Sequence, residues 1–323
     1  MKKLLGWFLM GIVIGCWGCS DDSEDAGVQG EELLREQQQI IEDYLADNNI
    51  NATRDGDIFY EVLTENPTGD TLARNDIIRI YYQIAVLDGQ IIDERLADSG
   101  EPPVTYQFVA SNIIDQNNLL FPVLDFSIAN MRVGEEYEFY LPSAFAYLRY
   151  SLEGVVPPDA IVRARVQLVE IVTEAQLRAE EDQLIKNYLT DNNLTDADSL
   201  TAGVYYVQTQ EGEADGAEAS QGSRVAVRYT GTFLDGTEFD SNVSTNTLLP
   251  FTVGSNNLID GFDIGVSQMR QGEKGTIVIP SRAAYRESVL AFPSEILSDL
   301  FQGDSFIPPY TTLVFDIELV SVN

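Results

Sequence analysis

The feature that most constrains the fold of this chain is a long internal repeat. Residues 40–50, IIEDYLADNNI, return 144 positions later as residues 184–194, LIKNYLTDNNL. Further matched pairs follow in chain order: Asp88-Gly89 with Asp235-Gly236, Met131-Arg132 with Met269-Arg270, and Pro157-Pro158 with Pro308-Pro309. The spacing drifts from pair to pair, so loops of different length interrupt one shared scaffold. Two copies of this size predict duplicated domains rather than a solenoid.

Each copy reads as one helix followed by a β-rich region. Apolar residues recur at helical spacing over residues 31–46 and again over 174–190. Short apolar runs separated by turn residues come after each helix, and residues 258–268 can form a short covering helix. The pattern is typical of an α+β layout, in which a helix covers an antiparallel sheet. We expect the two long helices to pack on their own β-domains or on each other.

Shifts in composition divide the chain into four segments. Residues 1–19 read as a lipoprotein signal peptide, and residues 20–30 read as an acidic tether without periodicity. Residues 31–172 form the first helix and its β-domain, and residues 173–323 form the second.

The signal segment ends in the only two cysteines of the chain, Cys16 and Cys19. Lys2 and Lys3 precede an apolar run, residues 4–15, that is too short to span a membrane. The segment resembles a bacterial lipoprotein signal, in which a cysteine becomes the acylated first residue. The acidic, serine-containing run after Cys19 favours that residue, whereas the residues before Cys16 fit the usual signal better. A plain secretory signal is the third interpretation.

Charge and composition exclude several classes of function. The chain carries 52 acidic and 19 basic residues, a net charge of −33, which repels phosphate backbones and excludes nucleic acid as a partner. The simplest reason for this charge is solubility. The absence of histidine excludes histidine-based triads and most zinc sites. We therefore expect neither a metal nor a cofactor.

The second copy contains a predicted β-hairpin and a series of motifs after it. Val225, Val227 and Tyr229 alternate onto one face, and Asp235-Gly236 predicts a two-residue turn. The motifs that follow are FTVG at 251–254, LIDGF at 258–262, Ala284-Tyr285, Ile307-Pro308-Pro309 and LVFDIEL at 313–319.

This series, over residues 222–323, resembles the FKBP family of peptidyl-prolyl isomerases. The resemblance implies a half-open antiparallel sheet wrapped on a short helix, with the substrate cleft between them. It also implies catalysis of X–Pro rotation, whose barrier of about 18–20 kcal/mol comes from amide resonance. A dry aromatic cleft weakens that resonance by removing water from the carbonyl oxygen, so the reaction needs no imidazole or metal. The preceding helices lie outside the family core.

The resemblance also implies roles for individual residues. The apolar wall of the cleft would consist of five aromatic residues: Tyr229, Phe239, Phe251, Phe262 and Phe315. Leu258 would lie at its edge, Ile259 would offer its backbone N–H to a substrate carbonyl, and Tyr285 would offer its hydroxyl. Asp240 would orient its neighbours by hydrogen bonds, and Ile307 would pack over the prolyl ring.

The second copy departs from the family pattern in three places. Phe262 stands where the family usually has tryptophan, and Arg286 stands where it usually has glycine. The loop 286–306 is also much longer than its family counterpart. Its apolar residues predict either a lid or client-binding edge, or a simple extension of the core.

The first copy retains only part of the cleft. Tyr82, Asp93 and Tyr147 match their counterparts, and Phe108 matches Phe251. Three aromatic positions of the wall are replaced, by Ile92, Leu124 and Ala164. We expect residues 74–172 to have weak or no isomerase activity and to bind extended chain or another protein instead.

Together these features predict a peptidyl-prolyl isomerase, lipid-anchored to the outer membrane, that acts through its C-terminal domain on proline-containing exported polypeptides. The main alternative is a non-catalytic subunit of an outer-membrane protein complex, with the cleft as a relic. A pure chaperone is a third possibility.

Overall fold

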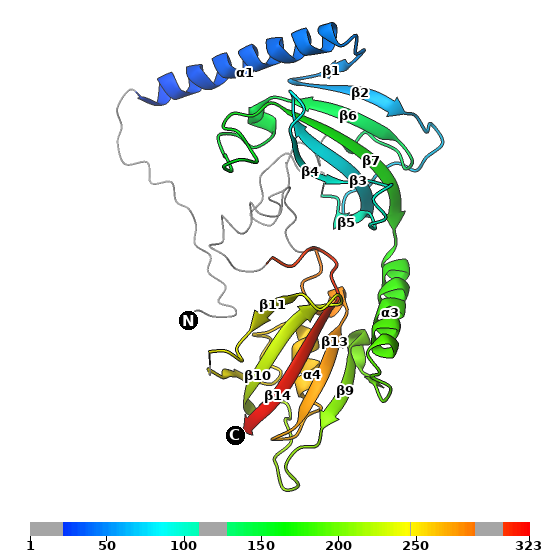
Figure 1. Ribbon diagram of the computed structural model, residues 1–323, viewed down its shortest axis with the longest axis vertical. Helices are drawn as coiled ribbons and strands as arrows, with labels where there is room; N and C mark the ends of the chain where they lie inside the picture. The colour runs from blue at the N-terminus through cyan, green and yellow to red at the C-terminus, as the bar shows by residue number, and fades with distance from the viewer. Residues whose placement is uncertain (1–21, 110–127, 246, 288–305) are drawn as a thin grey trace. The chain divides into compact units, whose positions relative to one another are not determined.

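The computed structural model describes residues 22–109, 128–245, 247–287 and 306–323 (Figure 1). The described chain separates into two compact units, one ending at Val172 and the other beginning at Thr173. We call them the first domain and the second domain. No helix among the described residues is both long enough and apolar enough to cross a membrane.

The first domain consists of one long helix and an antiparallel sheet. Its elements are α1 (Asp22–Asp47), β1 (Thr53–Asp55), β2 (Ile58–Thr64), β3 (Ile77–Val86), β4 (Ile91–Arg95), β5 (Val104–Gln107), β6 (Glu136–Leu141), the 3-10 turn η1 (Ser143–Phe145) and β7 (Val162–Val172). The helix begins at Asp22, so the part of the expected tether from residue 22 onward is helical. Extending a helix costs little once its anchored turns exist, because each added residue gains a hydrogen bond.

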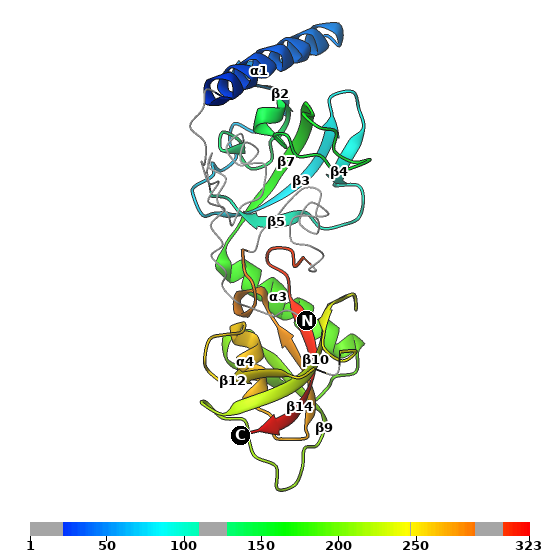
Figure 2. The ribbon, with the colours of Figure 1, turned by 90° about the vertical axis from the view of Figure 1, so that its left-hand side faces the viewer.

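The second domain repeats this order. Its elements are α3 (Glu174–Asp191), β8 (Asp198–Ser199), η2 (Thr201–Gly203), β9 (Tyr205–Gln210), β10 (Arg224–Phe233), β11 (Glu238–Ser241), β12 (Leu249–Thr252), α4 (Asp260–Val266), β13 (Lys274–Ile279), η3 (Ser281–Ala283) and β14 (Leu313–Val322). A capping box at Thr173 and Gln176 starts α3. Figure 2 shows α4 lying against the sheet of this domain. The equivalent segment of the first domain falls largely within residues 110–127, outside the described chain.

The two sheets share one topology. The first has the strand order β1-β2-β6-β7-β3-β4, with β5 paired to β3. The second has the order β11-β10-β14-β13-β9-β8, with β12 paired to β10, which is the same order read from the other edge. All of these pairings are antiparallel, so each sheet buries one face against its own apolar cluster. The repeat in the sequence is therefore a repeat of the fold.

The hairpin between β10 and β11 forms with a different turn from the one predicted. Gly236 donates to the carbonyl of Phe233 and has φ of 88°, whereas Asp235 is not among the residues with positive φ. A two-residue type I′ turn requires positive φ at both central residues. The chain instead makes a three-residue connection, because the N–H of Phe233 donates to the carbonyl of Thr237 at 2.9 Å. The Asp235 carboxylate accepts from the N–H of Thr237 at 2.9 Å.

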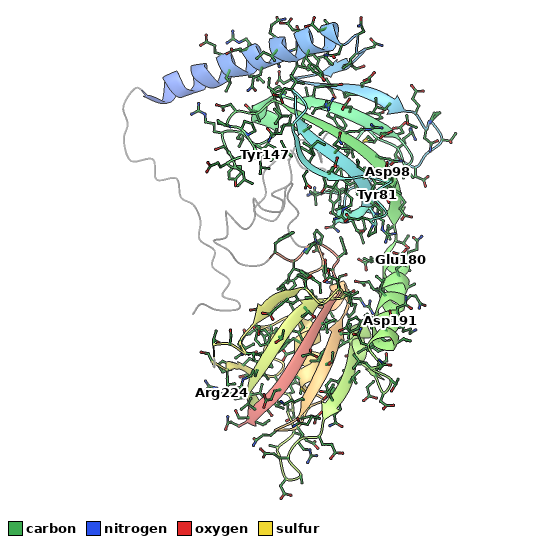
Figure 3. The ribbon with its side chains drawn as sticks, viewed as in Figure 1. Tyr81, Asp98, Tyr147, Glu180, Asp191 and Arg224 are labelled. Atoms are coloured by element: carbon green, nitrogen blue, oxygen red, sulfur yellow. The ribbon has the colours of Figure 1, made fainter. Side chains whose placement is uncertain are left out.

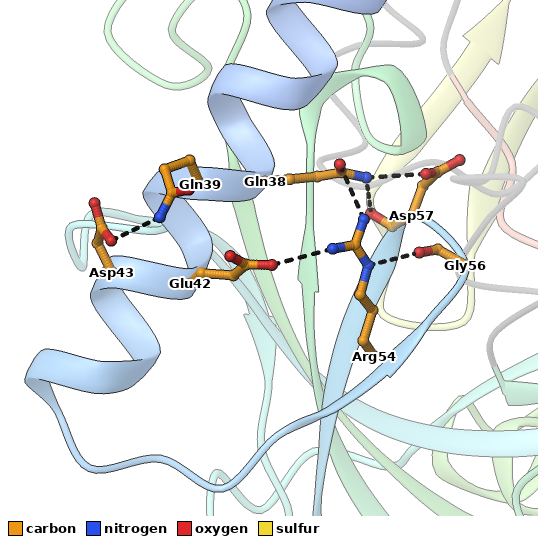
Figure 4. A network of polar contacts seen from close by, with 7 residues as sticks. All are labelled: Gln38, Gln39, Glu42, Asp43, Arg54, Gly56 and Asp57. Atoms are coloured by element: carbon orange, nitrogen blue, oxygen red, sulfur yellow. Dashed lines mark hydrogen bonds and ion pairs between the residues drawn. The ribbon is translucent and has the colours of Figure 1, made fainter.

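Each long helix packs on its own β-domain. Ile41 and Leu45 of α1 lie against Phe59 and Tyr140, and Ile185 and Leu189 of α3 form the corresponding cluster in the second domain. A polar network adds to the first contact (Figure 4): Arg54 pairs with Glu42 at 3.1 Å and donates to Gln38 at 3.1 Å. Gln38 in turn donates to Asp57 at 2.9 Å. The prediction that each long helix packs on its own β-domain is confirmed.

A second polar contact ties each helix to the turn after a central strand. The Gln37 side chain of α1 accepts from the N–H and the hydroxyl of Ser143, at 2.8 and 3.0 Å. At the equivalent position of α3, Glu181 accepts from the N–H of Ser281 at 2.7 Å and pairs with Arg282 at 3.5 Å. Burial raises the pKa of the Glu181 carboxyl, and the contacts with Ser281 and Arg282 oppose that shift.

Candidate functional site

Five aromatic rings from five elements meet at one end of the second domain's sheet. Phe262 of α4 lies at their centre, with its ring centroid 5.1 Å from Phe315 of β14, 5.9 Å from Tyr229 of β10 and 5.8 Å from Phe251 of β12. Phe239 of β11 meets Phe315 at 5.5 Å. All four contacts are edge-to-face, an arrangement that aromatic pairs prefer. The five predicted wall residues therefore form one cluster.

The close approach of two of these rings depends on a glycine. Gly231 lies opposite Phe315 in the β10–β14 ladder and opposite Asp240 in the β10–β11 ladder. A Cβ atom at this position would come within 2.7 Å of the Phe239 ring and 2.9 Å of the Phe315 ring. The sequence analysis did not identify Gly231, although a glycine inside a strand is itself a signal of close packing.

A small cleft opens on one side of the aromatic cluster. Its lining consists of Tyr229, Leu249, Leu258, Ile259, Phe262, Tyr285 and Phe315. Tyr229, Phe262 and Phe315 are almost fully buried and form its floor, whereas the other four are half-buried and form its rim. The cleft has a volume of about 20 Å³, close to the space for one water. A prolyl ring can therefore enter only when the side chains of the rim move apart.

Two hydrogen-bond donors of the cleft have no protein partner within the described chain. The N–H of Ile259, just before the first turn of α4, donates to no described atom, although its carbonyl accepts from Phe262. The hydroxyl of Tyr285 is likewise without a hydrogen bond there. Burial, and then the nearby Asp240 carboxylate, raise the pKa of Tyr285, so its hydroxyl keeps its proton. Both groups can bind carbonyl oxygens of an extended peptide.

Asp240 holds the floor of the cleft rather than its opening. Its carboxylate accepts from the Tyr229 hydroxyl at 2.7 Å. Burial and this hydrogen bond raise the pKa of Tyr229 above its ordinary value. The contact fixes the edge of one floor ring without placing a free charge over the apolar surface.

Not every predicted residue lies on the cleft itself. Phe239 and Phe251 support the floor rings from behind, and the cleft lining does not include them. Ile307 is half-buried and packs against the core of the domain. Leu249 lines the rim and was not predicted, although it lies two residues before Phe251 and therefore on the same face of β12. The functional roles assigned to these residues stay predictions.

Other predictions fall outside the described residues. They concern Cys16, Cys19, Leu124 and most of the loop 286–306. Arg286 itself is described, and it adopts φ of 48° in the left-handed region. This conformation explains why a glycine suits the position. Leu148 stands at the equivalent position of the first domain, with φ of 56°.

The first domain keeps the polar part of this arrangement, and among its described residues Ile92 and Ala164 stand where the second domain has Phe239 and Phe315. The Tyr82 hydroxyl donates to Asp93 at 3.0 Å, as Tyr229 does to Asp240. Tyr147, the counterpart of Tyr285, follows η1 in the loop after β6 (Figure 3). Ala164 lies opposite Ile84 in the ladder, where the second domain has Phe315 opposite Gly231. Ile84 is fully buried and fills the core at that point.

Within the described residues, no group of three or more histidine, cysteine, aspartate or glutamate side chains is arranged to hold a metal ion. The lining of the cleft in the second domain itself offers apolar surface and two neutral donors.

The two domains match a known class of protein. The model of the family "FKBP-type peptidyl-prolyl cis-trans isomerase" matches residues 69–169 and 216–320. These two matches cover more than half of the chain and fall in the two domains in turn. The chain therefore belongs to the FKBP-type peptidyl-prolyl cis-trans isomerase family and contains two FKBP-like domains.

The chain is also similar to individual proteins. The chain is 33% identical over 125 residues to FK506-binding protein 3 of Dictyostelium discoideum, covering 38% of this chain and 58% of the relative. It is 34% identical over 110 residues to an FK506-binding protein of Neisseria meningitidis serogroup C, covering 34% of this chain and 89% of the relative. Among solved structures, the three FKBP domains of wheat FKBP73 align at 20% identity with a TM-score of 0.34, covering 84% of this chain and 99% of that structure.

Proposed function

We propose that the second domain catalyses cis–trans isomerisation of X–Pro bonds in exported or envelope polypeptides. The observation that carries this proposal is the pairing of an aromatic floor with two unused donors, the Ile259 N–H and the Tyr285 hydroxyl. An extended peptide can be held by its carbonyl oxygens while its prolyl ring lies on the rings of Phe262 and Phe315.

The rate enhancement would come from exclusion of water. In water the planar amide is stabilised because solvent hydrogen-bonds to its partially negative oxygen. Over an apolar floor that stabilisation is lost, and the barrier of about 18–20 kcal/mol to rotation falls. The half-buried rim of the cleft closes around the imide and keeps solvent away during the twist. Uncatalysed rotation takes tens to hundreds of seconds, so unfolded exported chains are suitable substrates.

A protease-coupled assay with a proline-containing tetrapeptide tests the proposal. The full chain should accelerate isomerisation, Tyr229→Ala should remove most of the activity, and the matched Tyr82→Ala in the first domain should remove little. Far-ultraviolet circular dichroism would verify that both variants fold. Absence of activity above buffer in the wild-type chain would contradict the proposal.

The alternative is a non-catalytic binding subunit of an outer-membrane protein complex. Two observations favour it: the cleft has room for about one water, and the described part of the first domain has Ile92 and Ala164 in place of two of the cleft's rings. Under this alternative the wild-type chain would be inactive towards the tetrapeptide and would co-purify with a fixed envelope partner.

We further propose that the protein is anchored to the outer membrane by acylation of Cys19. The support is the apolar run before the cysteines and the acidic run after them. Incorporation of radiolabelled palmitate should be lost in Cys19→Ala and retained in Cys16→Ala. The opposite result would identify Cys16 as the acylated residue, and no incorporation into the wild-type chain would exclude a lipoprotein anchor.

A further inference from the structure

A second, larger hollow lies in the first domain, between α1 and its own sheet. This groove has a volume of about 660 Å³ and involves no residue of the candidate isomerase cleft. Its apolar lining comes from both sides: Leu33, Ile40 and Tyr44 of α1, and Val86, Leu87 and Ile161 of the β-domain. The groove is therefore an open hollow with an apolar floor, along a helix that is anchored at Ile41 and Leu45.

One apolar side chain of this groove is left in contact with water. Ile40 is 44% exposed, although its neighbour Ile41 is completely buried against the sheet. Such exposure of a large β-branched residue on a well-packed helix gains nothing for the stability of the domain. It provides apolar surface that a partner can cover, at about 25 cal/mol per Å² removed from water.

The charged residues that line the groove all have the same sign. They are Glu36, Asp43, Asp47, Asp88 and Asp159, and no lysine or arginine is among the lining residues. Asp159 contributes a further feature, because its Oδ1 atom is buried and has no hydrogen-bond partner within the described chain. Because that atom is out of reach of a partner, Asp159 adds to the negative potential of the groove and makes no direct contact through this oxygen. The rim therefore selects for positive charge.

We propose that this groove binds a cationic amphipathic polypeptide segment, in which lysine or arginine residues flank large apolar side chains. The apolar side chains would cover Ile40 and the adjacent floor, and the basic side chains would pair with the carboxylates of the rim. Opposite charge also speeds the encounter between partners, whereas an acidic segment is repelled. The proposal does not depend on isomerase activity, because the groove and the cleft lie in different domains.

The repeat supplies a matched comparison within the same chain. Leu184 of α3 occupies the position equivalent to Ile40 and is 51% exposed. Asp159 has Tyr310 as its counterpart, since each directly follows a Pro-Pro pair and each has positive φ. The second domain thus presents a similar exposed apolar residue, and it has the uncharged Asn187 and Tyr310 at the positions of Asp43 and Asp159. Substitutions at Ile40 and Leu184 remove similar amounts of exposed apolar area, but the two residues differ in the charge of the side chains around them.

Fluorescence anisotropy with a labelled twelve-residue peptide of alternating leucine and lysine tests the proposal on the full chain. We expect saturable binding that weakens about tenfold in Ile40→Gln and is unchanged in Leu184→Gln. The double variant Asp43→Asn with Asp88→Asn should also weaken binding, and a rise in salt from 50 to 300 mM should weaken the wild-type complex. Peptides of alternating leucine and glutamate, and of lysine and serine, serve as controls.

Equal effects of the two glutamine substitutions would overturn the assignment to this groove. Binding of the lysine–serine peptide as tight as that of the leucine–lysine peptide would show non-specific charge attraction and would equally overturn it. Binding of the leucine–glutamate peptide would exclude the role of the acidic rim. None of the peptides contains proline, so a negative result here and an inactive isomerase remain distinguishable outcomes.

Discussion

At one equivalent pair of residues in the core, the two domains place the large side chain on different strands. In the second domain the large side chain belongs to β14, as Phe315, and the residue opposite is Gly231. In the first domain the large side chain belongs to β3, as Ile84, and the residue opposite is Ala164. Both arrangements give a packed core, because one large and one small residue face each other across the ladder. In the second domain the ring of Phe315 lies beside a surface cleft, whereas the first domain has an aliphatic side chain at this point of its core, so a stable fold does not by itself preserve an aromatic residue here.

The largest expected effect comes from giving the second domain the large residue that the first domain has on the equivalent strand. The substitution Gly231→Ile forces a side chain into the rings of Phe239 and Phe315, which should cost about 1–3 kcal/mol of stability. It should reduce isomerase activity about a hundredfold, because the floor of the cleft is displaced. Urea unfolding and the tetrapeptide assay measure the two effects.

The double variant Gly231→Ile with Phe315→Ala sharpens the comparison. It reproduces the first-domain arrangement and should recover much of the lost stability without recovering activity. Recovery of activity would show that the ring of Phe315 is dispensable.

The next effect concerns the contact between each long helix and the turn after a central strand. The buried helix residue in the second domain is a glutamate with an arginine beside it, and in the first domain it is a glutamine without one. Glu181 has Arg282 beside it, whereas the residue equivalent to Arg282 in the first domain is Ala144. Gln37→Glu would place an unpaired carboxylate against the carbonyl of Asp159, which now accepts from Gln37 at 2.8 Å. We expect a loss of about 3 kcal/mol at neutral pH, measured by denaturant unfolding.

The pH dependence of that loss has a definite sign. Burial raises the folded-state pKa of such a carboxyl, so the folded state binds its proton more tightly than the unfolded state does. Stability is then greatest below the unfolded pKa, about 4.3, and falls as pH rises through the folded pKa. Glu181 shows the same direction of shift, so Glu181→Gln should flatten this part of the wild-type profile. A steeper profile in Glu181→Gln would contradict the argument.

A smaller effect is expected from one hydroxyl of the cleft. Tyr285→Phe removes a donor to the substrate and leaves the ring in place. The loss of one hydrogen bond, about 0.5–1.5 kcal/mol, corresponds to a fall in kcat/KM of about two- to twelvefold. The matched Tyr147→Phe should leave kcat/KM within the error of the assay, unless the first domain contributes to catalysis.

The smallest effect should come from the loop that begins after Tyr285. Arg286 and Leu148 both adopt the left-handed conformation, which costs a residue with a Cβ about 1–2 kcal/mol. Glycine removes that strain and adds freedom to the unfolded chain, so Arg286→Gly should stabilise the second domain by about 0.5 kcal/mol. Leu148→Gly should act similarly in the first domain. A loss of stability in both would show that other contacts hold these turns.

Much of this arrangement could be predicted from the sequence, because the repeat and the motifs are local patterns. The repeat predicted two domains with one scaffold, and the alternation around Tyr229 placed the ring on the core face of its strand. The two-residue turn predicted at Asp235-Gly236 was wrong, because the identity of two residues does not by itself fix the φ and ψ angles of each. Gly231 and Leu249 were missed because their contacts with the rings depend on which strands are neighbours in the sheet, and the sequence does not show that.

The contacts of the two helices were beyond prediction for a related reason. Gln37 and Ser143 are 106 residues apart, and nothing in their local sequence connects them. A comparison of the two copies does indicate that these positions are in contact. The second copy has glutamate and arginine where the first has glutamine and alanine. That correlation becomes visible only after the sheet has placed the serine turn beside the helix.

The hydroxyls of Tyr229 and Tyr285 have a consequence for where such a protein can work. Both have pKa values above the ordinary value for tyrosine, so neither gives up its proton between mildly acid and mildly alkaline surroundings. The Tyr285 hydroxyl that faces the cleft and the Tyr229 hydroxyl that fixes its floor would therefore survive such changes of acidity unaltered.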